Sequence, residues 1–138
     1  MRATIKWVGG AAFEGTSGSG HAVTMDGPPD EGGRNLGVRP MEMFLLGLGG
    51  CTAFDVVLIL QRGRHAVSDC AVEIEARRAD TVPKVFTDIH IHYKVAGKNL
   101  PESAVRRAVD LSANKYCSAS IMLGKACEIT HDYAIEED

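Results

Sequence analysis

The chain has 138 residues, a length that suits one domain with its own core, and 45% of its residues are hydrophobic. Its formal net charge is −3, without a basic cluster, so we expect no nucleic-acid partner. The N-terminus carries no apolar stretch of signal-peptide length. We therefore expect a single domain over residues 1–138, located in a reducing cytoplasm.

Three strands are predicted in the first 26 residues. Residues 2–8 alternate between apolar and polar side chains, with Ala3, Ile5 and Trp7 on one face. Residues 12–14 and 21–26 follow, each after glycine-rich turns. Residues 27–33 are rich in glycine and proline, which predicts a loop.

A long helix is predicted from Pro40 to about residue 64. Residues 43–60 are apolar on almost every side, but they include Asp55 and are too short and too polar for a membrane span. Such a helix needs cover all round. Its three glycines predict either a bend or the close approach of another segment. For Asp55, a structural hydrogen bond or ion pair is the favoured role.

The second half of the chain predicts a strand pair, two helices and a last strand. Residues 67–78 and 86–95 alternate and form an antiparallel pair, and Ile89, Ile91 and Tyr93 share the apolar face of the second strand. A helix begins with Asn99 as N-cap and Glu102 at the third helical position. A break near residues 115–117 leads to a helix over 118–126 and a strand over 127–135. The order β-β-β-α-β-β-α-α-β indicates an α+β fold.

Two cysteines are the main candidates for chemistry. A chain without secretory features has little use for a structural disulfide, so Cys51 and Cys117 suggest redox chemistry if the fold brings them together. Cys117 lies near a predicted helix start, where free N–H groups stabilise a thiolate. Cys51 has apolar neighbours and would need a cation. The available cations are Arg34, Arg39, Arg62 and Arg64. The alternative is that both are ordinary buried cysteines.

The remaining cysteines and histidines suggest weaker candidates. Cys70 and Cys127 fall in predicted strands, and the chain has no C-x-x-C motif, so we interpret both as structural. His90 and His92 share one strand face, and His131 lies on another strand. These three could form a metal site or a solvated sheet face. We favour the solvated face and expect no metal.

The segment Pro40-Met-Glu-Met-Phe-Leu-Leu-Gly-Leu-Gly-Gly-Cys51 resembles the first-cysteine motif of the OsmC/Ohr family, the osmotically inducible and organic hydroperoxide resistance proteins. The segment Ala108-Val-Asp-Leu-Ser-Ala-Asn-Lys-Tyr-Cys-Ser118 is similar to the YhfA-like branch of that family. The resemblance covers essentially the whole chain. It implies an OsmC-like intertwined homodimer, in which antiparallel sheets wrap around long central helices and the active sites lie at the interface.

The resemblance also implies a mechanism in oxidative-stress defence. Cys51 would be the peroxidatic residue, which attacks an organic hydroperoxide as a thiolate and becomes a sulfenic acid. Cys117 would be the resolving residue, which condenses with it to a disulfide. A dithiol such as dihydrolipoamide would then reduce that disulfide. No metal or organic cofactor is implied.

Two positions depart from the family pattern. Active peroxidases of the family carry a glutamate directly after the proline, whereas Met41 stands here and Glu42 follows. Glu42 is nine residues before Cys51, which places it about 180° away on a regular helix. The family arginine after the first strand is missing from residues 8–15, so Arg39 or Arg34 would have to supply the cation. These departures leave an alternative function, a non-catalytic dimer that binds a small molecule or senses redox state.

Overall fold

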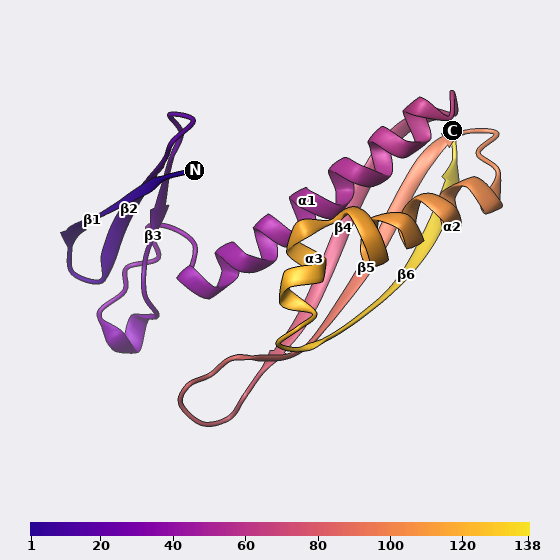
Figure 1. The fold of residues 1–138 in the computed structure, drawn as a ribbon. Coiled ribbons are helices and arrows are strands. Elements are labelled where there is room, and N and C mark those ends of the chain that lie inside the picture. Colours follow the sequence, from indigo (N-terminus) through magenta and orange to yellow (C-terminus); the bar gives the residue numbers. More distant parts are fainter. The chain divides into compact units, whose positions relative to one another are not determined.

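The computed structural model describes residues Met1–Asp138, which form two compact units, Met1–Leu46 and Gly47–Asp138. Helix α1 (Pro40–Arg62) begins in the first unit and continues in the second (Figure 1). The order of strands and helices is the predicted one, and the α+β class is confirmed.

The first unit contains a three-stranded antiparallel sheet. Its strands are β1 (Ala3–Gly9), β2 (Ala12–Ser17) and β3 (Ala22–Met25), and they pair in sequence order. The predicted loop contains a single 3-10 turn, Pro29–Glu31.

The buried carboxylate of Asp26 organises the loop that leads to α1. It accepts the backbone N–H groups of Gly27 at 2.8 Å, Arg34 at 2.9 Å and Leu36 at 3.2 Å. These hydrogen bonds, that from Arg34 foremost, hold the pKa of Asp26 below its usual range. One ionised side chain therefore fixes the path of about ten loop residues.

Helix α1 starts with a local cap and runs without a break. The carboxylate of Glu42 accepts the backbone N–H of Arg39 at 2.8 Å, and Pro40 takes the first helical position. The helix is continuous through its three glycines. A Cβ at Gly49 would lie 3.3 Å from Ile74 Cδ1, so the close approach at this position is to a strand.

The second unit contains a sheet with the order β4-β5-β6, made of β4 (Ala66–Arg78), β5 (Phe86–Lys98) and β6 (Glu128–Glu137). Strands β4 and β5 are antiparallel, as predicted. Strands β5 and β6 are parallel, so this sheet is mixed rather than purely antiparallel. The reason is the helical crossover between them, which returns the chain to the end of the sheet where β5 began.

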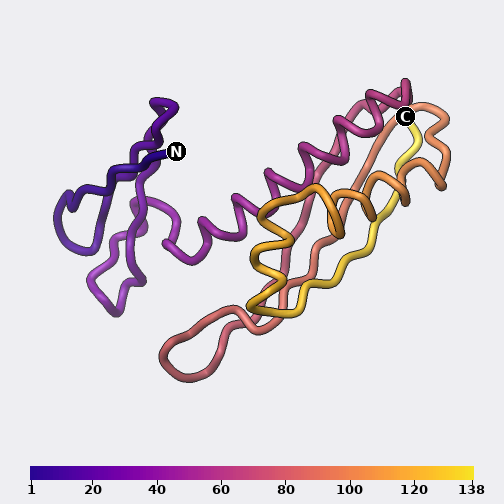
Figure 2. The backbone as a smooth tube through the Cα atoms, in the orientation of Figure 1, coloured from indigo at the N-terminus to yellow at the C-terminus, as the bar shows by residue number.

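That crossover consists of α2 (Glu102–Leu111), a π-helical turn (Ser112–Tyr116) and α3 (Ser118–Leu123). In the second unit the helices lie along one face of the sheet (Figures 1 and 2). The core lies between them, and its fully buried members include Val56, Leu60, Ile89, Ile91, Tyr93, Val95, Val105 and Val109.

The predicted cap of α2 is wrong. Pro101 occupies the N-cap position and makes no side-chain cap. Asn99 instead adopts a left-handed φ of 53°, and its backbone N–H donates to the Glu137 carboxylate at 3.0 Å. Asparagine tolerates this conformation better than most residues, which explains its use at the turn out of β5.

Helix α1 is long and apolar enough to cross a membrane when judged by length and composition alone, with a mean hydropathy of 2.1 over its best window. Core helices of water-soluble proteins have the same properties. Asp55 would lie within such a span, where a carboxylate is costly. Its carboxylate accepts a hydrogen bond from Ser112 of the same unit. The absence of a membrane span therefore remains our prediction.

Candidate functional site

Cys51 and Cys117 lie in the second unit on two different elements. Cys51 is half-buried on α1, whereas Cys117 is fully buried at the N-cap of α3. The Cys117 Sγ accepts the backbone N–H of Ser120 at 3.3 Å. The backbone N–H of Cys117 donates to the Ser112 carbonyl at 2.9 Å. All four cysteines of the chain are free thiols.

The surroundings of Cys117 raise the pKa of its thiol, and the Cys51 side chain is among the groups responsible. Burial is the main cause that raises the pKa of Cys117 to about 11, and the N–H of Ser120 opposes it. The Cys51 side chain raises the pKa further, through a hydrogen bond and through its charge. The N–H groups at the helix start lower the pKa of Cys117, as expected, but burial outweighs them. Cys117 keeps its proton at neutral pH.

A chain of hydrogen-bonded polar side chains connects α1 with β5 and the π-helical turn. Thr52 Oγ1 is 2.6 Å from the Tyr93 hydroxyl and 2.7 Å from Ser112 Oγ. Ser112 Oγ in turn lies 3.1 Å from a carboxylate oxygen of Asp55. Thr52, Tyr93 and Ser112 are fully buried. The structural role expected for Asp55 thus takes the form of a hydrogen bond to Ser112.

The chain of hydroxyls has a direction. The Asp55 carboxylate and the Thr52 carbonyl each lie 3.1 Å from Ser112 Oγ and only accept, so Ser112 donates to them, Thr52 donates to Ser112 and Tyr93 donates to Thr52. Burial keeps Tyr93 protonated and raises its pKa to about 12. Thr52 directly follows Cys51, and the Ser112 carbonyl holds the N–H of Cys117. The network therefore links the elements that carry the two thiols.

Arg39 and Glu42 both belong to the first unit. The Arg39 guanidinium donates to Asn35 Oδ1 and to the Gly37 carbonyl, each at 3.3 Å. The Glu42 carboxylate caps α1 through the Arg39 N–H. Both side chains thus have local structural partners, and their roles beside Cys51 stay predictions.

The three-histidine metal site is wrong. His90 Nε2 and His92 Nδ1 both contact Asp132 Oδ1, at 3.0 and 2.8 Å, on the sheet face away from the helices. His131 lies on the opposite face, where it contacts Asp110 at 3.2 Å and the ring edge of Tyr93. Side chains alternate along a strand, so His131 cannot join the other two. The chain contains no cluster of metal-ligating residues.

Cys70 and Cys127 take no part in the hydrogen bonds of this network. Burial raises the pKa of both thiols. The Cys127 thiol donates to the Leu123 carbonyl at 3.3 Å. Their interpretation as structural cysteines stays a prediction.

Sequence reasoning missed Thr52, Tyr93 and Ser112. Thr52 was detectable as a polar residue within the apolar helix, directly after Cys51. Tyr93 was placed correctly on the apolar face of its strand, but its hydroxyl needs a partner once it is buried. Ser112 carries no such signal, because its side-chain partners Thr52 and Asp55 are 60 and 57 positions away in the sequence.

Comparison with known proteins decides the family. The OsmC-like protein family model matches residues 32–132. The chain is 49% identical to protein YhfA of Escherichia coli (strain K12) over 135 residues, which is 98% of each chain. This chain belongs to the OsmC family.

Solved structures share this fold. A hypothetical protein from Aquifex aeolicus VF5 is 26% identical, with a TM-score of 0.87 over 99% of this chain and 96% of that one. The organic hydroperoxide resistance protein OhrB of Bacillus subtilis shares the fold at 16% identity, with a TM-score of 0.64 over 97% and 98% of the two chains.

Proposed function

We propose that this OsmC-family protein is a thiol-dependent peroxidase that reduces organic hydroperoxides. The observation that carries the proposal is the neighbouring pair Cys51 and Cys117, of which Cys117 is buried and protonated. A buried thiol with a raised pKa is a poor nucleophile but a suitable resolving residue. Cys51 is partly accessible and is therefore the peroxidatic candidate.

The chemistry then follows in three steps. The Cys51 thiolate attacks the outer peroxide oxygen and breaks the O–O bond, so that Cys51 becomes a sulfenic acid and the alkoxide takes a proton to leave as an alcohol. The Cys117 thiol attacks the sulfenic sulfur, which forms the Cys51–Cys117 disulfide and releases water. A dithiol, for example one of the lipoyl type, reduces the disulfide and becomes oxidised itself. No cofactor takes part.

The same proposal includes a homodimer in the cytoplasm. Phe54 on α1 is 65% exposed within the chain, and a Cβ at Gly47 or Gly50 would meet nothing within 4 Å. A helix face of this kind suits close packing by a second helix. We also treat the two units as parts of one OsmC-like domain, because the family match spans both of them.

The proposal is tested by counting thiols in the reduced protein before and after one equivalent of cumene hydroperoxide per chain. We expect a loss of two thiols, which peptide mapping assigns to a Cys51–Cys117 disulfide that a dithiol reverses. The matched control is Cys127→Ser, which should behave like the unmodified protein. If all four thiols survive, or if Cys51→Ser is oxidised equally fast, peroxide reduction at Cys51 is refuted.

A second candidate function is a non-catalytic dimer that binds a small molecule or senses redox state. The local engagement of Arg39 and Glu42 favours it, because a thiolate without a supporting cation reacts slowly. Multiple-turnover assays distinguish the two. A single round of disulfide formation without turnover on any dithiol supports the sensor, and sustained peroxide consumption supports the enzyme.

A further inference from the structure

The second unit contains a cleft between α1 and α2 that the peroxide chemistry does not use. Its volume is about 590 Å³, a size typical of sites for small organic ligands. Leu58 and Ile59 of α1 and Leu111 of α2 supply apolar walls. Arg62 of α1 and Arg107 of α2 supply two positive charges.

Neither arginine has a partner in the chain. No hydrogen bond or ion pair is formed by the guanidinium of Arg62 or of Arg107, whereas neighbouring Arg106 pairs with Glu102 at 3.2 Å. The one carboxylate that lines the cleft, Asp55, accepts the Ser112 hydroxyl. The C-terminal acids are also engaged, because Glu137 accepts the Asn99 N–H and Asp138 accepts the Ser68 hydroxyl. The cleft therefore carries net positive charge.

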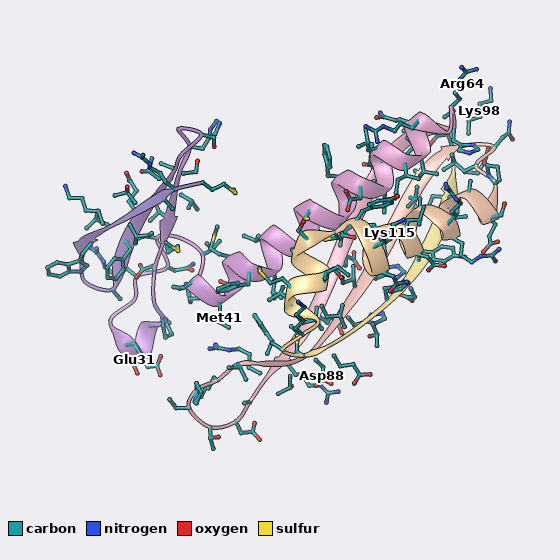
Figure 3. The ribbon with its side chains drawn as sticks, in the orientation of Figure 1. Glu31, Met41, Arg64, Asp88, Lys98 and Lys115 are labelled. Atoms are coloured by element: carbon teal, nitrogen blue, oxygen red, sulfur yellow. The ribbon has the colours of Figure 1, made fainter.

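The two arginines lie toward the same end of the cleft. Arg62 is one helical turn beyond Leu58, and Arg107 is one turn before Leu111. Helix α2 runs back along the sheet from the end where α1 finishes (Figure 1), so from that end Arg62 comes before Leu58 on α1 and Arg107 comes before Leu111 on α2. This end is also the one at which Arg64 and Lys98 lie, opposite Asp88 (Figure 3). The apolar residues fill the inner part.

The inner part leads toward the thiols. Tyr116 lines the cleft and directly precedes Cys117. Asp55 lines it one turn after Cys51. A ligand held by its charged end at the arginines would therefore direct its other end toward the cysteine pair.

We propose that this cleft binds an aliphatic acid, with its carboxylate on Arg62 and Arg107 and its chain along Leu58 and Leu111. A planar guanidinium matches a carboxylate with two parallel hydrogen bonds, and the apolar walls bury the chain. The binding claim stands by itself. Only its catalytic consequence, a preference for acid-terminated over neutral hydroperoxides, rests on the proposed function.

The test uses decanoate, which is redox-inert, titrated calorimetrically into the full-length Cys51→Ser protein. We expect one site per chain, and about tenfold weaker binding for Arg62→Gln and for Arg107→Gln. Arg106→Gln removes the same charge from the same helix outside the cleft and should bind normally. Decylamine should not bind, and decyl phosphate shows whether the site accepts any oxyanion or prefers a carboxylate.

Several results would overturn the proposal. They are the absence of saturable decanoate binding, an equal loss in Arg106→Gln, or equal binding of decylamine. A change of oligomeric state in Arg62→Gln and Arg107→Gln by sedimentation would assign the cleft to an interface between copies instead. Because the probe carries no peroxide, a failure here leaves the peroxidase proposal intact, and thiol counting tests that proposal separately.

Discussion

Replacement of Ser112 by alanine tests whether the buried polar chain holds the thiol-bearing elements together. The substitution removes a hydroxyl that contacts Thr52 Oγ1 at 2.7 Å and Asp55 at 3.1 Å. Thr52 then lacks an acceptor, and the Asp55 carboxylate lacks its only side-chain donor. A lost buried hydrogen bond of this kind costs about 1–3 kcal/mol, with the upper part expected where one partner is charged.

The assay is urea unfolding of the reduced protein, followed by far-UV circular dichroism at one fixed protein concentration, because a dimer's stability depends on concentration. We expect the midpoint to fall by about 1 M urea. Ser118→Ala is the matched control: Ser118 is exposed just past the same turn, and its loss should change stability by less than about 0.5 kcal/mol.

A double-mutant cycle separates the network from a simple packing effect. Thr52→Val keeps the shape of the side chain and removes its hydroxyl. If the hydroxyls form one network, the double variant loses less stability than the two single variants together, with a coupling of about 0.5–3 kcal/mol. Strict additivity, or a Ser112→Ala variant as stable as Ser118→Ala, would refute the reasoning.

Three further predictions follow from named contacts. The lowered pKa of Asp26 stabilises the folded state at pH values above the ordinary aspartate pKa near 4, and this stabilisation is lost as pH falls through the folded-state pKa. In a thermal-unfolding series from pH 7 to 3, the unfolding temperature of Asp26→Asn should therefore depend less on pH than that of the unmodified protein. The Cys117 pKa of about 11 acts in the opposite sense, because its contribution to stability is fully present below the unfolded thiol pKa near 8.5 and is lost as pH rises toward 11. In urea titrations over this alkaline range, Cys117→Ala should therefore lose less of its unfolding free energy than the unmodified protein. An equal loss in both proteins would contradict the prediction. Glu42→Gln keeps an acceptor for the Arg39 N–H, whereas Glu42→Ala costs about 0.5–2 kcal/mol as a lost cap; if Glu42→Gln also slows oxidation of Cys51, the carboxylate acts on the thiol as well.

Local patterns predicted the elements, and long-range contacts decided what the sequence could not show. Alternation in residues 86–95 placed Ile89, Ile91 and Tyr93 on the buried face correctly, because strand periodicity is a local property. The parallel partner of that strand was missed, because pairing direction depends on how the crossover returns. Asn99 was misread for a related reason: its sequence suits an N-cap, but Glu137, 38 residues later, binds its N–H.

For the candidate site, too, the sequence predicted the local features and missed those that depend on spatial neighbours. Cys51 and Cys117 were found from their motifs, but burial outweighs the expected effect of the helix start on Cys117. Burial depends on the residues that surround Cys117 in space, and its helix position alone does not reveal them. The three-histidine hypothesis failed on strand parity, since His131 and His90 occupy opposite faces of one sheet.

The parallel pairing of β6 with β5 has a consequence for biosynthesis. Strand β6 is translated after every other element of the fold, yet it pairs with β5 from Glu128 to Glu137 and forms one wall of the compartment beneath α2. While the ribosome still holds those residues, α2 and the turn before Cys117 lack one strand of the sheet that they cover. We therefore expect the second unit to complete its sheet only after Glu137 has left the ribosome.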